Sequence, residues 1–126
     1  MGRFWIGTSL LVIFLVLGLW VGATTEQTHS QIAQLLEQAA QQTVQGHPEE
    51  GAALAEQAAK DWESHRKAVA AVADHAPMEV IDSRFAQLQI FQQQAQHPCF
   101  AASCAELAKL VEAVGEAHKL TWWNLL

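Results

Sequence analysis

The residues of this chain best suited to chemistry lie between Asp61 and Asp82, in the sequence DWESHRKAVAAVADHAPMEVID. Histidine nitrogens and carboxylate oxygens are common metal ligands in proteins. Asp61 and His65 are four residues apart, so on a helix they share one face and could hold one metal ion together. Another helix would have to complete the site, and Glu79 and Asp82 could do so. A ligand- or metal-sensing site built on His65, His75 and Glu79 is therefore one hypothesis.

The same stretch has a structural interpretation, which we favour. No Glu stands three residues before either histidine, so the Glu-x-x-His signature of metal sites in helical bundles is absent. If the chain reverses at Pro77, Asp82 faces residues 69–72 rather than His65. Trp62 is then a core anchor whose indole N–H needs one acceptor. We therefore predict a capped helical hairpin here, with no metal and no cofactor.

Cys99 and Cys104 are the only two cysteines. In an exported protein a disulfide between them is chemically permitted. On one continuous helix the two side chains would point about 140° apart and could not bridge. Pro98, however, favours a loop at Cys99, and this leaves the bridge open. The spacing is not Cys-x-x-Cys, and no Ser/His/Asp set, phosphate loop or suitable carboxylate pair is visible, so the chain is predicted not to be an enzyme.

After the N-terminal segment of about 24 residues, the sequence shows the periodicity of helices, and no strand pattern is present. We predict helices over residues 30–45, from Pro48 to about 75, from Pro77 to about 91, and from about 101 onward. These helices make an all-α fold, an antiparallel hairpin or bundle of three to four helices. The apolar positions predicted to face its interior are Ile32, Leu35, Leu36, Ala39, Val44, Ala55, Ala58, Trp62, His65, Val69, Val72, Ile81, Phe85, Leu88, Phe91, Leu107, Leu110, Val111 and Val114.

The larger apolar residues of the last two helices, together with Trp62, place the expected core in the second half of the chain. The first soluble helix could pack on the others or stand away from them as a stalk. The predicted organisation is thus an anchor over residues 1–24, a stalk or first soluble helix over 25–46, and a helical bundle over 47–126.

The N-terminal segment FWIGTSLLVIFLVLGLWVGA, from Phe4 to Ala23, contains no charge. At a rise of about 1.5 Å per residue it is long enough to span a hydrocarbon core of about 30 Å. We predict one N-terminal transmembrane helix that is retained as a signal-anchor. A signal peptide cleaved after Ala23 is the alternative. Arg3 precedes the segment and the next Lys or Arg is Lys60, so the N-terminus is predicted to be cytoplasmic and the rest to lie outside.

The net charge of the chain and two glycines of its apolar segment indicate which classes of partner the protein could bind. The chain carries a formal net charge of −6, which argues against nucleic acid, because duplex binding depends on basic patches. Gly18 and Gly22 form a small-xxx-small pair on the apolar helix, a pattern that allows two membrane helices to pack closely.

The C-terminal residues Trp122, Trp123 and Asn124 have three interpretations. They could be a second contact with the membrane interface, or a patch that binds a partner. The interpretation we favour is that the aromatic pair closes the open end of the bundle, with Asn124 capping the preceding helix.

The order of these features resembles the bacterial family called domain of unknown function 4363. The resemblance rests on Trp62, on His75, Glu79 and Asp82 in DHAPMEVID, on Arg84 and Leu88 in SRFAQLQ, and on the segments CAELAKLVEAV and WWNLL. It implies a small, membrane-anchored helical protein of bacteria, and it implies no reaction.

Taken together, these patterns indicate an interaction or scaffold protein on the outer side of a bacterial cell membrane. It would cross the membrane once and would bind another envelope protein or a second copy of itself. The alternatives are a ligand- or metal-sensing ectodomain of an envelope system and an exported helical protein whose signal has been cleaved.

Overall fold

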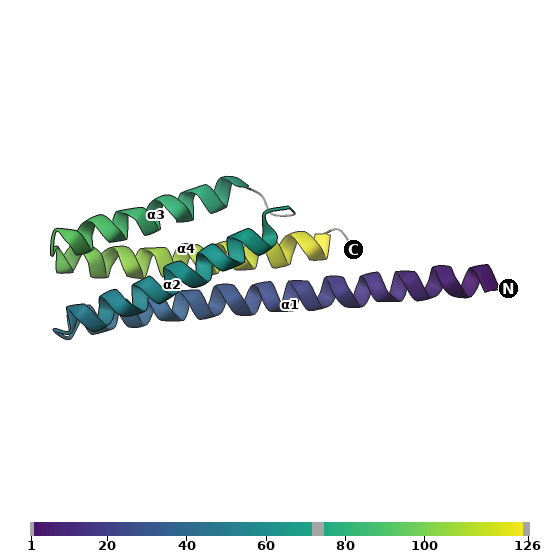
Figure 1. Ribbon diagram of the computed structural model, residues 1–126, viewed down its shortest axis with the longest axis horizontal. Coiled ribbons are helices and arrows are strands. Elements are labelled where there is room, and N and C mark those ends of the chain that lie inside the picture. Colours follow the sequence, from purple (N-terminus) through teal and green to yellow (C-terminus); the bar gives the residue numbers. More distant parts are fainter. Residues whose placement is uncertain (1, 72–74, 125–126) are drawn as a thin grey trace.

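The computed structural model describes residues 2–71 and 75–124, without the side chains of residues 3, 21, 22, 24, 25 and 118–124. The described part contains four helices and no strand: α1 (Gly2–Val44), α2 (Pro48–Val69), α3 (His75–Gln93) and α4 (His97–Asn124). Successive helices run in opposite directions (Figure 1). The all-α, antiparallel fold predicted from the sequence is therefore confirmed.

The helix boundaries follow from local chemistry. Each of the three prolines lies in the first turn of a helix, where its missing N–H leaves no carbonyl without a partner. Glu49 and Glu50 occupy the first turn of α2, and Arg66 and Lys67 its last turn. Both pairs complement the helix dipole.

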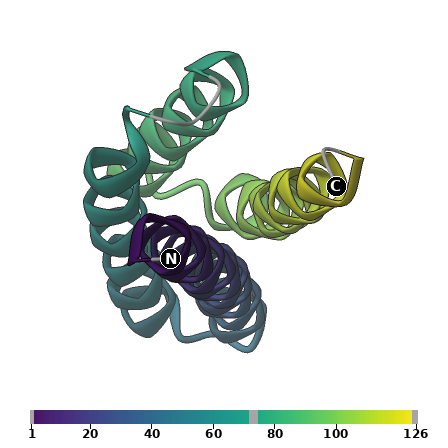
Figure 2. The same cartoon turned by 90° about the vertical axis from the view of Figure 1, so that its right-hand side faces the viewer.

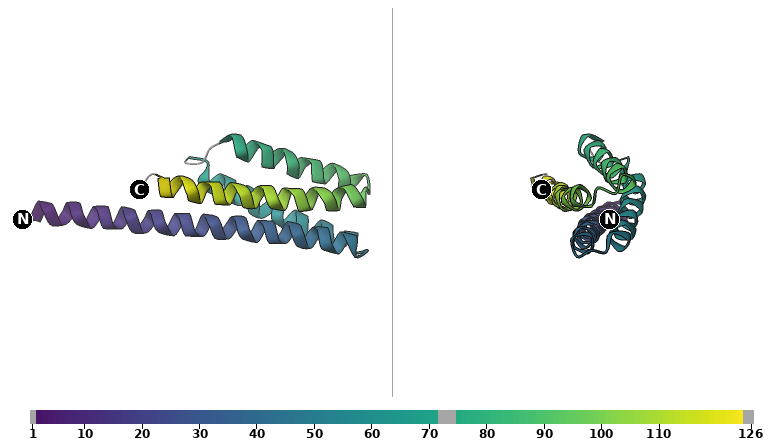
Figure 3. Two further views of the ribbon diagram at one scale, coloured as in Figure 1. Left: turned by 180° about the vertical axis from the view of Figure 1, so that it is seen from behind. Right: turned by 90° about the vertical axis from the view of Figure 1, so that its left-hand side faces the viewer.

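α1 is one continuous helix, and its two halves have different surroundings. Its second half packs between α2 and α4, whereas its first half extends beyond the other three helices (Figure 3). The chain therefore combines a bundle with a single projecting helix. In the described part of the chain we find no helical segment that is apolar over a length sufficient to cross a membrane.

The core lies along the whole bundle. The prediction that it lies mainly in the second half of the chain was wrong. Ile32 and Leu36 of α1 are as fully buried as Ile81 of α3 and Leu107 and Val111 of α4. The reason is that α1 packs closely along α4, so the first soluble helix does not stand away as a stalk. Val44 was also expected in the core but is 77% exposed, because α1 ends there.

α2 and α3 make few contacts with each other, although they are consecutive. Seen along the bundle axis, α2 lies against α1 (Figure 2), whereas α3 makes most of its contacts with α4. Trp62 connects α2 to α3, because its ring stacks on Phe85 of α3 with the ring centroids 6.4 Å apart.

Candidate functional site

A group of aromatic and imidazole rings fills the bundle between α1, α2 and α3. Trp62 and His65 come from α2, one turn apart on its buried face, and His29 comes from α1. The His29 ring meets the His65 ring edge to face, with centroids 4.6 Å apart. Both rings lie 5.9 Å from the indole of Trp62. We call these three residues the histidine–tryptophan cluster.

The cluster is buried, with exposed fractions of 3% for His29, 3% for Trp62 and 9% for His65. α4 closes it from the fourth side at Gly115. A Cβ atom added to Gly115 would lie 3.0 Å from the Cβ of His29, so the absence of a side chain there lets α4 approach α1 closely.

The cluster is linked to the surface by hydrogen bonds through Asp82 of α3. The indole N–H of Trp62 donates to Oδ1 of Asp82 over 2.8 Å, which provides the acceptor that the sequence analysis required. The other oxygen, Oδ2, lies 3.1 Å from Nε of Arg66. One carboxylate thus joins a buried ring to a half-exposed guanidinium.

The position of Asp82 corrects the predicted register of the α2–α3 hairpin. Asp82 was expected beside residues 69–72, but it contacts Trp62 and Arg66, which lie earlier on α2. The predicted turn was too short: α2 ends at Val69, and α3 begins at His75. A longer link moves every residue of α3 toward earlier residues of α2.

The three candidate metal ligands do not come together. His65 is buried against His29, whereas His75 and Glu79 are exposed on the first two turns of α3. Among the described residues there is no group of three His, Cys, Asp or Glu side chains placed to hold a metal ion.

His29 was missed in the sequence analysis because the first soluble helix was begun at Ser30. A signal for it was available. His29, Ile32, Leu36, Ala39 and Thr43 follow an alternating three–four spacing, and all five are buried. Extending the buried face of α1 by one step would have placed a second histidine in the core.

The possible disulfide between Cys99 and Cys104 is absent, because both are free thiols. α4 begins at His97, so Cys99 lies on the helix and not in a loop. Five residues apart on a helix, the two side chains point in different directions: Cys99 is exposed and Cys104 is fully buried. Burial raises the pKa of the Cys104 thiol from 9.0 to about 12.

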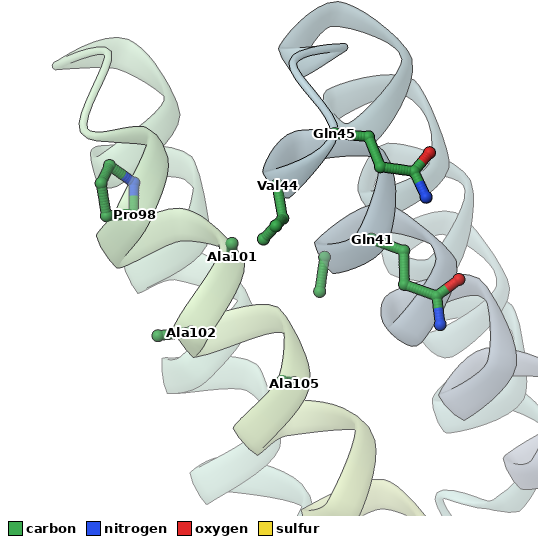
Figure 4. Close-up of a pocket in the computed structure, with 8 residues that line it drawn as sticks. Gln41, Val44, Gln45, Pro98, Ala101, Ala102 and Ala105 are labelled. Carbon is green, nitrogen blue, oxygen red and sulfur yellow. The ribbon is translucent and has the colours of Figure 1, made fainter.

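A shallow groove of about 540 Å³ lies between the end of α1 and the start of α4. Figure 4 shows Val44 directed toward the α4 side, while Gln41 and Gln45 point away from it. The side of α4 that faces the groove provides Pro98, Ala101, Ala102 and Ala105. Because this lining is apolar and has no converging polar groups, it offers no catalytic arrangement.

The C-terminal residues Trp122, Trp123 and Asn124 occupy the last turn of α4, and their side chains lie outside the described part. The same holds for Gly22, while Gly18 lies on the first half of α1 and is half-buried. Their predicted roles therefore remain predictions.

Comparison with known proteins agrees with the resemblance noted in the sequence. The model of the family described as Domain of unknown function (DUF4363) matches residues 19–125, from the first half of α1 to the end of α4. No curated protein and no solved structure matches the chain. Since the matched region covers most of the chain, the protein belongs to the DUF4363 family.

Proposed function

We propose that this protein crosses a bacterial membrane once, through the first half of α1, and presents its helical bundle on the outer side as a binding or scaffold module. The observation that carries the proposal is the contrast within α1. One uninterrupted helix has its second half in a protein core and leaves large apolar side chains exposed along its first half.

The exposed side chains are too large and too numerous for a water-facing helix. Phe4, Trp5, Phe14, Leu19 and Trp20 are each at least 68% exposed. Contiguous apolar surface of this kind is normally covered by a membrane or a partner. In the sequence an uncharged and mainly apolar segment runs from residue 4 to 23 and includes Val21 and Gly22, whose side chains fall outside the described part.

The orientation rests on charge. Arg3 stands directly before the uncharged stretch, and no Lys or Arg follows until Lys60 on α2. Positive charge near a membrane helix favours the cytoplasmic side, so the bundle would lie outside.

Binding is favoured over catalysis by the chemistry of the bundle. Polar side chains such as Asp82 form hydrogen bonds and ion pairs between helices, and they do not converge on a groove. The exterior is acidic overall, with a formal net charge of −6 for the chain. A partner would therefore be another envelope protein or a second copy of this chain, and not nucleic acid.

The anchor is tested by placing charges in the first half of α1. The double variant Leu11→Arg/Ile13→Arg should release the full chain from alkali-washed membranes, because each Arg near a bilayer centre costs about 2.5–3.5 kcal/mol on insertion scales. Gln38→Arg/Gln41→Arg, on exposed positions of the same helix, is the matched control and should remain in the pellet. Full recovery of the unsubstituted chain in the soluble fraction would contradict the anchor.

The mass of the protein isolated from whole cells separates a retained anchor from a cleaved signal. Retention predicts the intact N-terminal segment, whereas cleavage predicts a chain that begins at Thr24. The scaffold role is tested by purification in a mild detergent, where a specific co-purifying protein or a stable self-complex is expected. A solitary monomer under all extraction conditions would contradict it.

A further inference from the structure

The contact between His29 and His65 is the part of the histidine–tryptophan cluster whose charge can change near neutral pH. An imidazole in an unfolded chain has a pKa of about 6.5. Here the two rings come from different helices, meet edge to face with centroids 4.6 Å apart, and are 3% and 9% exposed. Two cations this close, and removed from water, would repel one another and lose their hydration. The folded bundle therefore holds fewer protons on this pair in acid than the unfolded chain does.

The packing around the pair leaves the rings little room to move apart. α4 approaches His29 at Gly115, where an added Cβ atom would lie 3.0 Å from the Cβ of the histidine. The indole of Trp62 lies 5.9 Å from each imidazole ring, measured between centroids. A ring that gains a charge cannot turn toward water without displacing one of these neighbours. Repulsion between the two rings would therefore act on the helices that carry them.

The interface between α1 and α2 changes along its length. Near the link between these helices the contact is made by small residues: a Cβ atom added to Gly51 would lie 2.8 Å from the carbonyl oxygen of Ala39, and Ala55 is buried nearby on α2. Further along, the two helices meet through the rings of His29 and His65. Separation caused by charge would therefore begin at the rings, while the contact at Gly51 stays closed.

Charged side chains on the surrounding helices do not share the burial of the pair. Those on the described turns beside the cluster are exposed or half-buried, so water largely screens their charges. They are Glu26 of α1, Asp61, Glu63, Arg66 and Lys67 of α2, Glu79, Asp82 and Arg84 of α3, and Glu112 and Glu116 of α4. Asp82 and Arg66 pair with each other, as do Glu63 and Lys67. His118 and Lys119 follow on α4, and their side chains lie outside the described part.

We propose that the contact between His29 and His65 is an acid-sensitive lock, which holds α1 against α2 while at least one ring is neutral and opens when both are protonated. The stability that the lock provides is complete above a pH of about 6.5 and declines as the pH falls below it, because the unfolded chain then binds protons that the folded bundle excludes. The inference does not depend on the anchor, since the pair lies inside the bundle.

The first test is the pH dependence of urea unfolding for the full chain in a neutral detergent. Each proton that the pair excludes should lower the folding equilibrium constant about 30-fold between pH 8 and pH 5. The original chain should therefore lose about 30-fold more over this range than His29→Gln/His65→Gln. His47→Gln/His75→Gln, at two exposed histidines, is the matched control and should keep the full loss. Equal losses in the original chain and in the first double variant would overturn the lock.

The single variants show whether the two rings act as a pair. His29→Gln and His65→Gln each leave one imidazole without its charged neighbour, so each should remove most of the acid loss. A full loss that persists in both single variants would overturn the lock, because the acid sensitivity would then belong to other groups.

A second measurement follows the opening and needs no change at either histidine. Trp5→Phe/Trp20→Phe/Trp122→Phe/Trp123→Phe leaves Trp62 as the only indole. Its emission should shift reversibly to longer wavelength between pH 6.5 and pH 5, as water reaches the cluster, while far-UV circular dichroism shows that the helices remain. Unchanged emission down to pH 5 would overturn the proposal. The same shift after addition of His29→Gln/His65→Gln would also overturn it, by assigning the opening to other groups.

Discussion

Asp82 is the residue that connects the buried cluster to solvent. It accepts from the indole of Trp62 at 2.8 Å and from Arg66 at 3.1 Å, and its side chain is 31% exposed. The ion pair itself contributes little, because both partners reach water. The hydrogen bond to Trp62 matters more, since an indole N–H in the core without an acceptor loses its interaction with water and gains nothing in return.

Asp82→Ala should therefore lower the free energy of unfolding by about 1–3 kcal/mol, the cost of a buried donor left without a partner. Asp82→Asn, which keeps an acceptor oxygen, should lose less. Asp61→Ala is the matched control, because Asp61 accepts only an exposed hydrogen bond from Gln57 in the described part of the chain. Urea unfolding measures all three. Equal losses at positions 61 and 82 would contradict this role of Asp82.

Cys104 gives a second prediction at this scale, which concerns pH. Its thiol pKa is about 12 in the folded protein against 9.0 for a free thiol, because burial disfavours the thiolate. Unfolded chains therefore lose this proton first, and the contribution to stability is complete below pH 9 and declines as the pH rises toward 12. Cys104→Ala should remove this part of the alkaline destabilisation.

The measurement is the difference in unfolding free energy between the original chain and Cys104→Ala at pH 8 and pH 10. The difference should shrink at the higher pH, and a constant difference would contradict the prediction. In the folded state a thiol reagent should label Cys99, which is exposed, and should reach Cys104 only after unfolding.

At the scale of the helices, α1 and α3 end in the same way but with different residues. After α1, the N–H of His47 bonds to the carbonyl of Gln42 and that of Gly46 to Thr43. After α3, the N–H of Gln96 bonds to Phe91 and that of Ala95 to Gln92. Both are Schellman motifs, which place one residue at positive φ. Gly46 has φ 89° and Ala95 has φ 53°.

Ala95→Gly should stabilise the protein, and Gly46→Ala should destabilise it, each by about 1 kcal/mol, because only glycine adopts this conformation without a steric cost. The two substitutions lie at equivalent positions and should change the stability in opposite directions, so each is a control for the other. Thermal unfolding of both variants measures the effect. The same sign for both would contradict the assignment of these helix ends.

α1 also provides a test of where the core lies. Leu36 is fully buried between helices, whereas Val44 is 77% exposed at the end of α1. Leu36→Ala should cost about 2–5 kcal/mol, as is usual for a large core side chain. Val44→Ala should change the unfolding free energy by less than about 0.5 kcal/mol. A small effect at Leu36 would instead indicate a stalk that stands apart from the bundle.

At the scale of the whole molecule, polarity changes along the long axis. The projecting half of α1 exposes large apolar side chains, whereas the second half of α1 buries its apolar side chains in the bundle. This contrast is the basis of the proposed anchor, which would hold the first half of α1 in the membrane. The groove between the end of α1 and the start of α4 lies at the opposite end of the molecule from the projecting half of α1 (Figure 1).

Self-association through the membrane would depend on Gly18 and Gly22. If two copies pack along this pair, Gly18→Ile/Gly22→Ile should abolish a dimer in detergent or vesicles, because the larger side chains hold the helices apart. Gly7→Ile lies on the same helix outside the pair and is the control. Cross-linking in native membranes measures the dimer, and a dimer that survives the double change must form through the bundle.

Much of the fold could be predicted from local patterns. The helices, their proline starts and the stop at Gly46 depend on neighbouring residues alone, and so do the buried faces at Ala55, Ala58 and Trp62. The sequence alone also implied that Trp62 needs an acceptor. The boundaries were less accurate at the α2–α3 link, where a run of alanine and valine continues a helical pattern without a clear stop.

Only the tertiary structure decided which residues meet. It paired Trp62 with Asp82, brought His29 against His65, separated Cys99 from Cys104, and placed α1 in the core. The physical reason is that helix formation depends on neighbours within a few residues, whereas helix pairing depends on link length and on close approach at residues such as Gly115. The sequence determined the elements and their apolar faces, and the packing of those faces determined the cluster.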